Sequence, residues 1–175
     1  TDGKPVNLDL WTYEVINGNE IKLSRGISCD LVAGYDKNNI VNGQIIGKVP
    51  QYIKISGKNE FYLVTNMGYT FSRCSSLTTA PEIPNSVTNM SDTFSYCSIL
   101  TTAPEIPASV TSMVSTFEKC YKLEGTIVIN ANPKNYGSCF KNAATEGSGL
   151  KVTGSSNKLD ELIATGNSNY IKKGE

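Results

Sequence analysis

Two glutamates, Glu82 and Glu105, form the carboxylate pair that most invites a catalytic interpretation, because they occupy one position in two copies of a repeated motif. A retaining glycosidase holds its two carboxyl groups about 5–5.5 Å apart, and the stacking of repeat units could supply that spacing. Duplication of the motif nevertheless explains both residues without a catalytic role. A calcium ion between them would need more oxygen ligands than two carboxylates provide. We therefore expect both glutamates to lie on a solvated surface.

The composition excludes most other catalytic chemistry. The chain has no histidine, which rules out every triad or dyad that uses an imidazole base. It has no Cys-x-x-Cys pair that would suit zinc, and its glycines lack the spacing of a phosphate-binding loop. The sequence therefore predicts a protein that is not an enzyme, with no catalytic residue, no metal site and no cofactor.

Three of the five cysteines, Cys74, Cys97 and Cys120, recur every 23 residues. Stacked at one core position, they should behave as small buried hydrophobes with free thiols. Disulfide bonds are the alternative, since stacking also brings Cα atoms within the range of about 4.4–6.8 Å that a disulfide spans. Adjacent bonding would leave one of the three without a partner. Cys29 and Cys139 are out of this register, and the sequence suggests no partner for either.

The 23-residue period organises the chain from Met67 to Asn135. Its first two copies, MGYTFSRCSSLTTAPEIPNSVTN and MSDTFSYCSILTTAPEIPASVTS, agree at 17 of 23 positions. A fixed period of this length is typical of a solenoid, in which each unit buries its apolar side only against its neighbours. The positions that repeat are Met67, Met90 and Met113; Phe71, Phe94 and Phe117; the three cysteines above; and Leu77, Leu100 and Leu123.

Within one copy, the apolar spacing predicts a short helix and then a short strand. Met90, Phe94 and Cys97 lie at i, i+4 and i+7, one face of a helix that Thr88 or Asn89 can cap. The segment 100–106, LTTAPEI, suits an irregular strand that prolines interrupt. Coils of this kind should stack roughly 4.8 Å apart. The phenylalanines that would then form one buried stack are Phe71, Phe94, Phe117 and Phe140.

These residues resemble a known family. The pattern F-x-x-C-x-x-L-T-x-A-P-x-I-P-x-S-V-T-x-M occurs from Phe71 to Met90 and from Phe94 to Met113. It resembles the BspA-type (treponemal-type) leucine-rich repeats of surface and secreted proteins of anaerobic and gut bacteria and of some mucosal parasites. The clear match covers residues 64–129. The resemblance implies a curved solenoid and a role in adhesion or protein binding, and it implies no shared catalytic site.

Periodicity and resemblance together predict an α/β fold. It would be a leucine-rich-repeat right-handed solenoid with 23-residue coils of short strand plus short helix, an N-terminal β-hairpin cap and a C-terminal helical cap. We interpret the chain as one domain, residues 1–175. Residues 1–60 would form the N-terminal cap and a first irregular coil, 61–153 the repeats, and 154–175 the C-terminal cap.

The two caps have their own signals. Leu10 to Val15 and Glu20 to Leu23 alternate as two strands of a hairpin around Asn17-Gly18-Asn19. Trp11 would lie in the core of this cap. Residues 157–164 have the apolar spacing of a helix, which Ser156 could cap and Gly166 could end.

Charge and hydropathy limit the partners. Sixteen basic and sixteen acidic residues balance, which argues against nucleic-acid binding. No apolar run approaches the roughly 18 residues of a membrane span, so we expect no membrane insertion in this segment. The start at Thr1 shows no signal peptide and is typical of a trimmed mature chain. Abundant Asn, Ser, Thr and Gly suit an extracellular or cell-surface module, which we expect to be a monomer.

The candidate binding surface is polar. We predict binding of a protein partner from a host or bacterial surface, with a structural spacer in a larger surface protein or a carbohydrate-binding module as alternatives. Exposed aromatic rings in one groove would favour a sugar. Threonine and glutamate ladders along the strands are the first candidates, and tyrosines at the predicted helix ends are the second. The candidate residues are Thr78, Thr79, Glu82, Thr101, Thr102, Glu105, Tyr96 and Tyr121.

Overall fold

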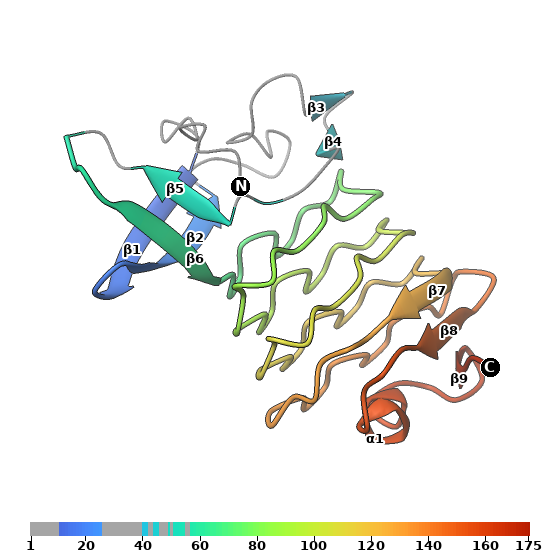
Figure 1. The fold of residues 1–175 in the computed structure, drawn as a ribbon. Coiled ribbons are helices and arrows are strands. Elements are labelled where there is room, and N and C mark those ends of the chain that lie inside the picture. The colour runs from blue at the N-terminus through green and yellow to red at the C-terminus, as the bar shows by residue number, and fades with distance from the viewer. Residues whose placement is uncertain (1–10, 26–39, 42–43, 46–48, 50, 55–56) are drawn as a thin grey trace.

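The computed structural model describes residues 11–25, 40–41, 44–45, 49, 51–54 and 57–175. A small mixed sheet forms the N-terminal end, irregular coils form the middle, and a parallel sheet with one short helix forms the C-terminal end (Figure 1). The elements are β1 (Trp11–Asn17), β2 (Glu20–Arg25), β3 (Ile40–Val41), β4 (Gln44–Ile45), β5 (Tyr52–Lys54), β6 (Phe61–Asn66), β7 (Gly125–Val128), β8 (Leu150–Thr153), α1 (Leu159–Ile163) and β9 (Ile171–Lys173).

The N-terminal sheet has the strand order β1-β2-β6-β5, while β3 and β4 pair separately. β1 and β2 form the hairpin that the sequence predicts, and Gly18 adopts a φ of +51° in its turn. β2 runs parallel to β6, which leads into the first coil, and β5 lies antiparallel to β6. Ile21, Leu23, Ile53 and Val64 are fully buried and belong to the same core as the coils. The side chain of Trp11 and all of Cys29 lie outside the described part of the chain.

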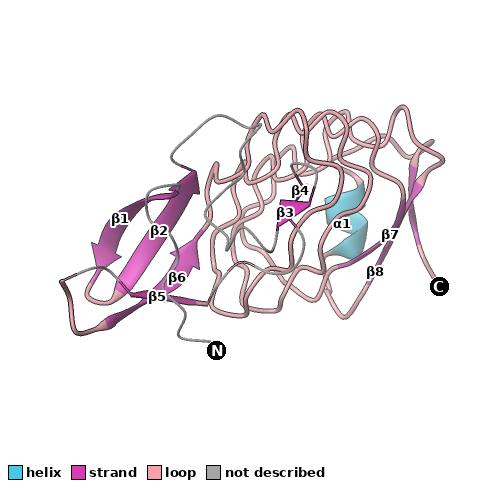
Figure 2. Cartoon of the chain, turned by 90° about the horizontal axis from the view of Figure 1, so that it is seen from above, coloured by secondary structure: helices cyan, strands magenta, loops and turns pink. Residues whose placement is uncertain are grey.

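Successive coils lie side by side with like residues in register (Figures 1 and 2). The strand predicted at 100–106 is reduced to isolated parallel bridges, because prolines interrupt the ladder. Each bridge joins residues 23 positions apart, as the sequence period requires. The bridged pairs include Asn66 with Asn89, Thr79 with Thr102, Asn89 with Ser112, and Ile106 with Ile129.

The helix predicted in each coil is wrong, and consecutive turns replace it. Thr93 N donates to Met90 O at 3.1 Å and Cys97 N donates to Phe94 O at 3.0 Å, which are three-residue turn contacts and not helical four-residue contacts. Every second amide donates to the following coil. In the second coil, Asp92 N donates to Val114 O at 2.8 Å, Phe94 N to Thr116 O at 3.0 Å and Tyr96 N to Glu118 O at 2.8 Å.

The turns place side-chain-bearing residues in the left-handed region at two positions of every coil. The φ of Asp92 is 55° and that of Tyr96 is 61°. These conformations let the chain reverse twice per coil, yet they leave no sequence signal because the residues are not glycines. The equivalent residues are Tyr69, Ser115 and Ser138 at the first position, and Arg73, Lys119 and Asn142 at the second.

A phenylalanine column forms the centre of the core, as the sequence predicts. Its ring centroids are 5.4, 5.6 and 5.5 Å apart and its rings are within 12° of parallel. Beside it, the Oγ1 of Thr93 donates to Met67 O at 2.8 Å and the Sγ of Cys97 lies 3.1 Å from Phe71 O, so buried polar atoms are satisfied by the preceding coil. Phe71, Phe94, Phe117 and Phe140 are all fully buried.

The cysteine prediction is confirmed for the repeat positions. Cys74, Cys97 and Cys120 are buried free thiols, and Cys139, which is out of register with them, is a fourth. Burial raises the pKa of the Cys120 and Cys139 thiols far above the ordinary value. A buried thiol of this kind is a poor nucleophile.

The predicted fold class is also wrong at the C-terminal end. β7, β8 and β9 form a parallel sheet, so a strand covers the last coil where a helical cap was expected. α1 has five residues, and Ser156 Oγ accepts from Lys158 N without capping the helix itself. The described residues are thus mostly strands and loops, with one short helix, and the chain is not an α/β leucine-rich-repeat solenoid with helical coils. Among the residues that the structure describes, no helix has the length and apolar character needed to cross a membrane.

Candidate functional site

The candidate surface on the first two coils, here called the strand face, comprises Thr78, Thr79, Glu82, Thr101, Thr102 and Glu105. The Thr79–Thr102 bridge and the bond from Ala80 N to Thr102 O at 2.9 Å hold the two coils in register. Thr101 donates to Thr78 O through its backbone N at 2.8 Å and through its Oγ1 at 3.0 Å. The face is therefore built by backbone contacts between coils, and its side chains stand in fixed rows.

The side chains of the strand face differ in what they can offer a partner. Thr79, Glu82, Thr102 and Glu105 are exposed, whereas Thr78 and Thr101 are half-buried. The Thr101 hydroxyl is already used on the backbone. The exposed four are the members that can contact another molecule.

Glu105 is positioned by side chains that the sequence did not suggest. Asn130 Nδ2 donates to Glu105 Oε1 at 2.7 Å, and Asn130 Oδ1 accepts from the backbone N and Oγ of Ser155 at 3.1 and 3.0 Å. These bonds continue the face across the third coil toward the end of β8. No pattern in the sequence indicates these bonds, because Asn130 and Ser155 stand 25 residues apart, outside the 23-residue period.

The C-terminal sheet carries charge of the opposite sign. Lys151 on β8 and Lys172 on β9 are exposed and are direct cross-strand neighbours. Nearby, Glu124 accepts from the backbone N and Oγ of Ser148, and the backbone bond above all lowers the pKa of its carboxyl below the ordinary range.

The two candidate tyrosines are not part of the strand face. Tyr96 lies between cationic groups from the coils on either side, with the Arg73 guanidinium carbon 4.7 Å and Lys119 Nζ 4.3 Å from its ring centroid. Lys119 Nζ also donates to the Tyr96 hydroxyl at 2.8 Å, which raises the pKa of Lys119. Tyr121 is half-buried, and its electrostatic interaction with Lys119 also raises the pKa of Lys119. Arg73, Tyr96 and Lys119 occupy the second left-handed turn position of three successive coils, and this turn geometry stacks their side chains.

Asp92 is a carboxylate at the other left-handed turn position of the second coil. Asp92 accepts a hydrogen bond from the Tyr69 hydroxyl, and Tyr69 is 60% exposed. Desolvation raises the pKa of Asp92 most, the nearby Glu118 raises it further, and the hydrogen bonds from Tyr69 and Ser95 oppose both. The Asp92 carboxyl group is therefore partly sheltered from solvent and lies near a second carboxylate, that of Glu118.

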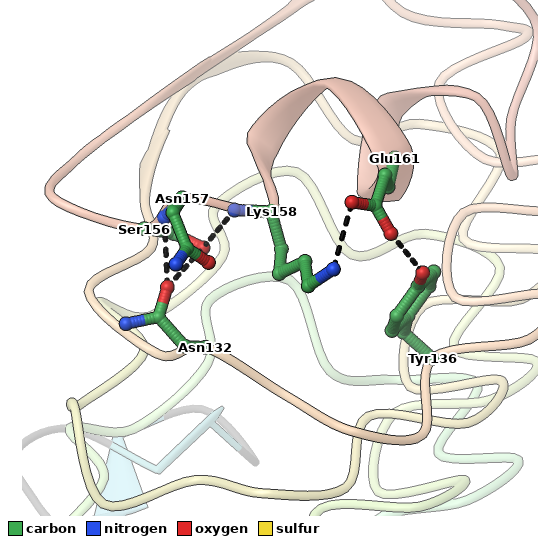
Figure 3. Close-up of polar contacts among 6 residues, drawn as sticks. All are labelled: Asn132, Tyr136, Ser156, Asn157, Lys158 and Glu161. Atoms are coloured by element: carbon green, nitrogen blue, oxygen red, sulfur yellow. Dashed lines mark hydrogen bonds and ion pairs between the residues drawn. The ribbon is translucent and has the colours of Figure 1, made fainter.

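The polar side chains around α1 hydrogen-bond to one another and to the nearby backbone (Figure 3). Asn132 Oδ1 accepts from Ser156 Oγ at 3.3 Å and from Asn157 N at 2.7 Å. Glu161 pairs with Lys158 Nζ at 2.8 Å and accepts from the Tyr136 hydroxyl, and the Lys158 bond above all lowers the pKa of Glu161. These contacts join α1 and the residues just before it to the segment that contains Asn132 and Tyr136.

No group of three or more metal-binding side chains occurs within the residues that the structure describes. Scans against protein-family models, curated proteins and solved structures each find nothing similar to this chain. A functional assignment therefore rests on the geometry of the strand face and its surroundings.

Proposed function

We propose that the chain is a non-catalytic protein-binding module, with the exposed strand face as its contact surface. The observation that carries the proposal is the in-register pairing of Thr79 with Thr102, two exposed threonines that are each followed three residues later by an exposed glutamate, Glu82 or Glu105. These four residues offer hydroxyl and carboxylate groups at fixed spacing. A partner would meet a surface that is already ordered, which reduces the entropy lost on binding.

The backbone supports this assignment of the face. Carbonyl and amide groups of neighbouring coils are bonded to one another, as in the bonds from Thr101 N to Thr78 O and from Ala80 N to Thr102 O. Fewer backbone groups are then left for a partner, so the side chains supply the specificity. The balanced charge of the chain predicts an affinity that depends only weakly on salt, and it gives no basis for nucleic-acid binding.

A role at the cell surface follows from the resemblance to BspA-type repeats. The F-x-x-C-x-x-L motif supports membership of that family, and its members act in adhesion outside the cell. We therefore place this module in a secreted or cell-surface protein, in contact with a host or bacterial surface protein. One copy of the chain presents the whole strand face, so this binding requires only a monomer.

The carbohydrate alternative is less well supported. A sugar ring stacks on an open aromatic face, whereas Arg73 and Lys119 both lie over the Tyr96 ring. The spacer alternative predicts that no partner exists.

The test is an affinity capture from host and bacterial surface extracts with three immobilised proteins. The first is the wild type, and the second replaces Thr79 and Thr102 with Ala and Glu82 and Glu105 with Gln. The third is the control, Tyr96→Ala with Tyr121→Ala. A partner retained by the wild type and the control but lost by the strand-face variant supports the proposal. Retention by the strand-face variant and loss by the tyrosine variant would reject it, and no captured protein would favour the spacer.

A further inference from the structure

We propose that β1 is a dimerisation edge, and that two copies of this chain pair their β1 strands antiparallel about a two-fold axis. This contact lies apart from the strand face, and it replaces the monomer expected from the sequence. Among the described strands, β1 pairs with β2 alone and is therefore a terminal strand of its sheet. In Figures 1 and 2 it lies at the end of the molecule away from β7, β8 and β9.

The apolar side of β1 continues the buried core. Tyr13 pairs with Leu23 and Val15 pairs with Ile21, and directly paired residues share one face of a sheet. Leu23 and Ile21 are fully buried, yet Tyr13 is 38% exposed and Val15 is 49% exposed. The core-facing side of the sheet thus extends onto β1, where two large apolar side chains remain partly in solvent.

β1 also lacks the protection that the terminal strands β5 and β9 have. Natural proteins shield sheet edges with short strands, lysines, prolines or bulges. β5, at the opposite edge of the same sheet, has only three residues, and β9 carries two exposed lysines. β1 has seven residues, WTYEVIN, with no lysine, arginine or proline, and its one register shift lies at the hairpin end.

A second copy is the occupant that fits this edge. Pairing of identical strands about a two-fold axis requires a self-complementary surface. A register centred on Tyr13 sets the two Tyr13 side chains together and keeps the two Glu14 carboxylates from facing each other, whereas a register centred on Glu14 would oppose like charges. The two four-stranded sheets would then join into one.

The experiment measures the mass of the native chain by sedimentation velocity over a range of concentrations. The wild type should show twice the chain mass of 18.9 kDa. Tyr13→Lys should weaken dimerisation by about tenfold or more, because a lysine at a sheet edge blocks strand pairing. The matched control is Tyr52→Lys, which changes an equally exposed tyrosine on the other terminal strand of the sheet. The control should remain dimeric.

A second variant guards against misfolding of Tyr13→Lys. Paired strands place opposed Cα atoms about 4.5–5.5 Å apart, within the reach of a disulfide. In a Cys29→Ser background, Tyr13→Cys should therefore form an intermolecular disulfide on mild oxidation, and neither Tyr52→Cys nor the background protein should. A monomeric wild type at all concentrations, or equal cross-linking of the two cysteine variants, would overturn the proposal. A monomer that instead binds a foreign strand at β1 would also overturn it.

Discussion

Phe94 is the residue on which the coil stack depends most directly. Its ring lies between those of Phe71 and Phe117, at centroid distances of 5.4 and 5.6 Å, and it is fully buried. Phe94→Ala should lower the free energy of unfolding by roughly 3–5 kcal/mol, since it removes a ring from a packed interior. Urea denaturation followed by circular dichroism measures this loss. Phe61→Ala, at a site 47% exposed, is the control, and an equal loss at both sites would contradict the stack.

Asp92 predicts a pH effect of known sign. Desolvation raises the pKa of its carboxyl above the ordinary value of 3.8, so the folded chain holds this proton more tightly than the unfolded chain does. Stability should therefore fall as the pH rises through the raised pKa, and Asp92→Asn should remove this fall. Asparagine also tolerates the left-handed φ of 55° at this position.

The measurement is urea denaturation of the wild type and Asp92→Asn between about pH 3 and pH 7, the range around an ordinary aspartate pKa. Subtracting the two curves removes the titration of the carboxylates that do not interact with Asp92, which leaves Asp92 and its neighbour Glu118. The advantage of the variant should grow with pH and then level off. An advantage that shrinks with rising pH would mean that hydrogen bonds from Tyr69 and Ser95, and not desolvation, dominate at Asp92.

At the scale of the element, the turn that replaces each predicted helix can be tested by one residue. Ser138 has a φ of 57°. Ser138→Gly should leave the protein equally stable or up to about 1 kcal/mol more stable, because glycine adopts this region without strain. Ser138→Val should be less stable by roughly 1–2 kcal/mol. Thermal unfolding compares the three proteins, and a helix would give the opposite sign for glycine, a poor helix former.

The sequence predicted which side chains stack but not the backbone that carries them. Phe71, Phe94 and Phe117 recur every 23 residues, and that period alone places them in one column. The helix was wrong because the spacing of Met90, Phe94 and Cys97 also fits consecutive turns. The acceptor for Phe94 N is Thr116 O, on the next coil, and no local pattern reveals it.

The candidate site also has features that the sequence predicts and features that it does not. Thr79 and Thr102 were expected in register because they repeat, and the structure pairs them. The contact of Tyr96 with Arg73 and Lys119 depends on left-handed turns. The sequence does not reveal these turns, because no glycine marks them. The Glu105–Asn130 bond arises where the period begins to drift.

At the scale of the whole molecule, equivalent coils should be removable as units. Deletion of residues 90–112 joins Asn89 to Met113 and brings Phe117 beneath Phe71 in the same register. The remaining coils can then rebuild the same set of bonds, so the shortened chain should fold with a lower denaturation midpoint, as repeat stability is roughly additive. Circular dichroism and thermal unfolding measure this outcome. A chain that no longer folds would contradict the equivalence of the coils.

Protein binding through the strand face is tested most directly by calorimetric titration of the partner that the wild type captures. The titration uses the wild type and the variant that changes Thr79, Glu82, Thr102 and Glu105, with matched unfolding curves to show that both are folded. The predicted result is a loss of affinity of about tenfold or more, equivalent to at least 1.4 kcal/mol. An unchanged dissociation constant in the folded variant would contradict the proposed function.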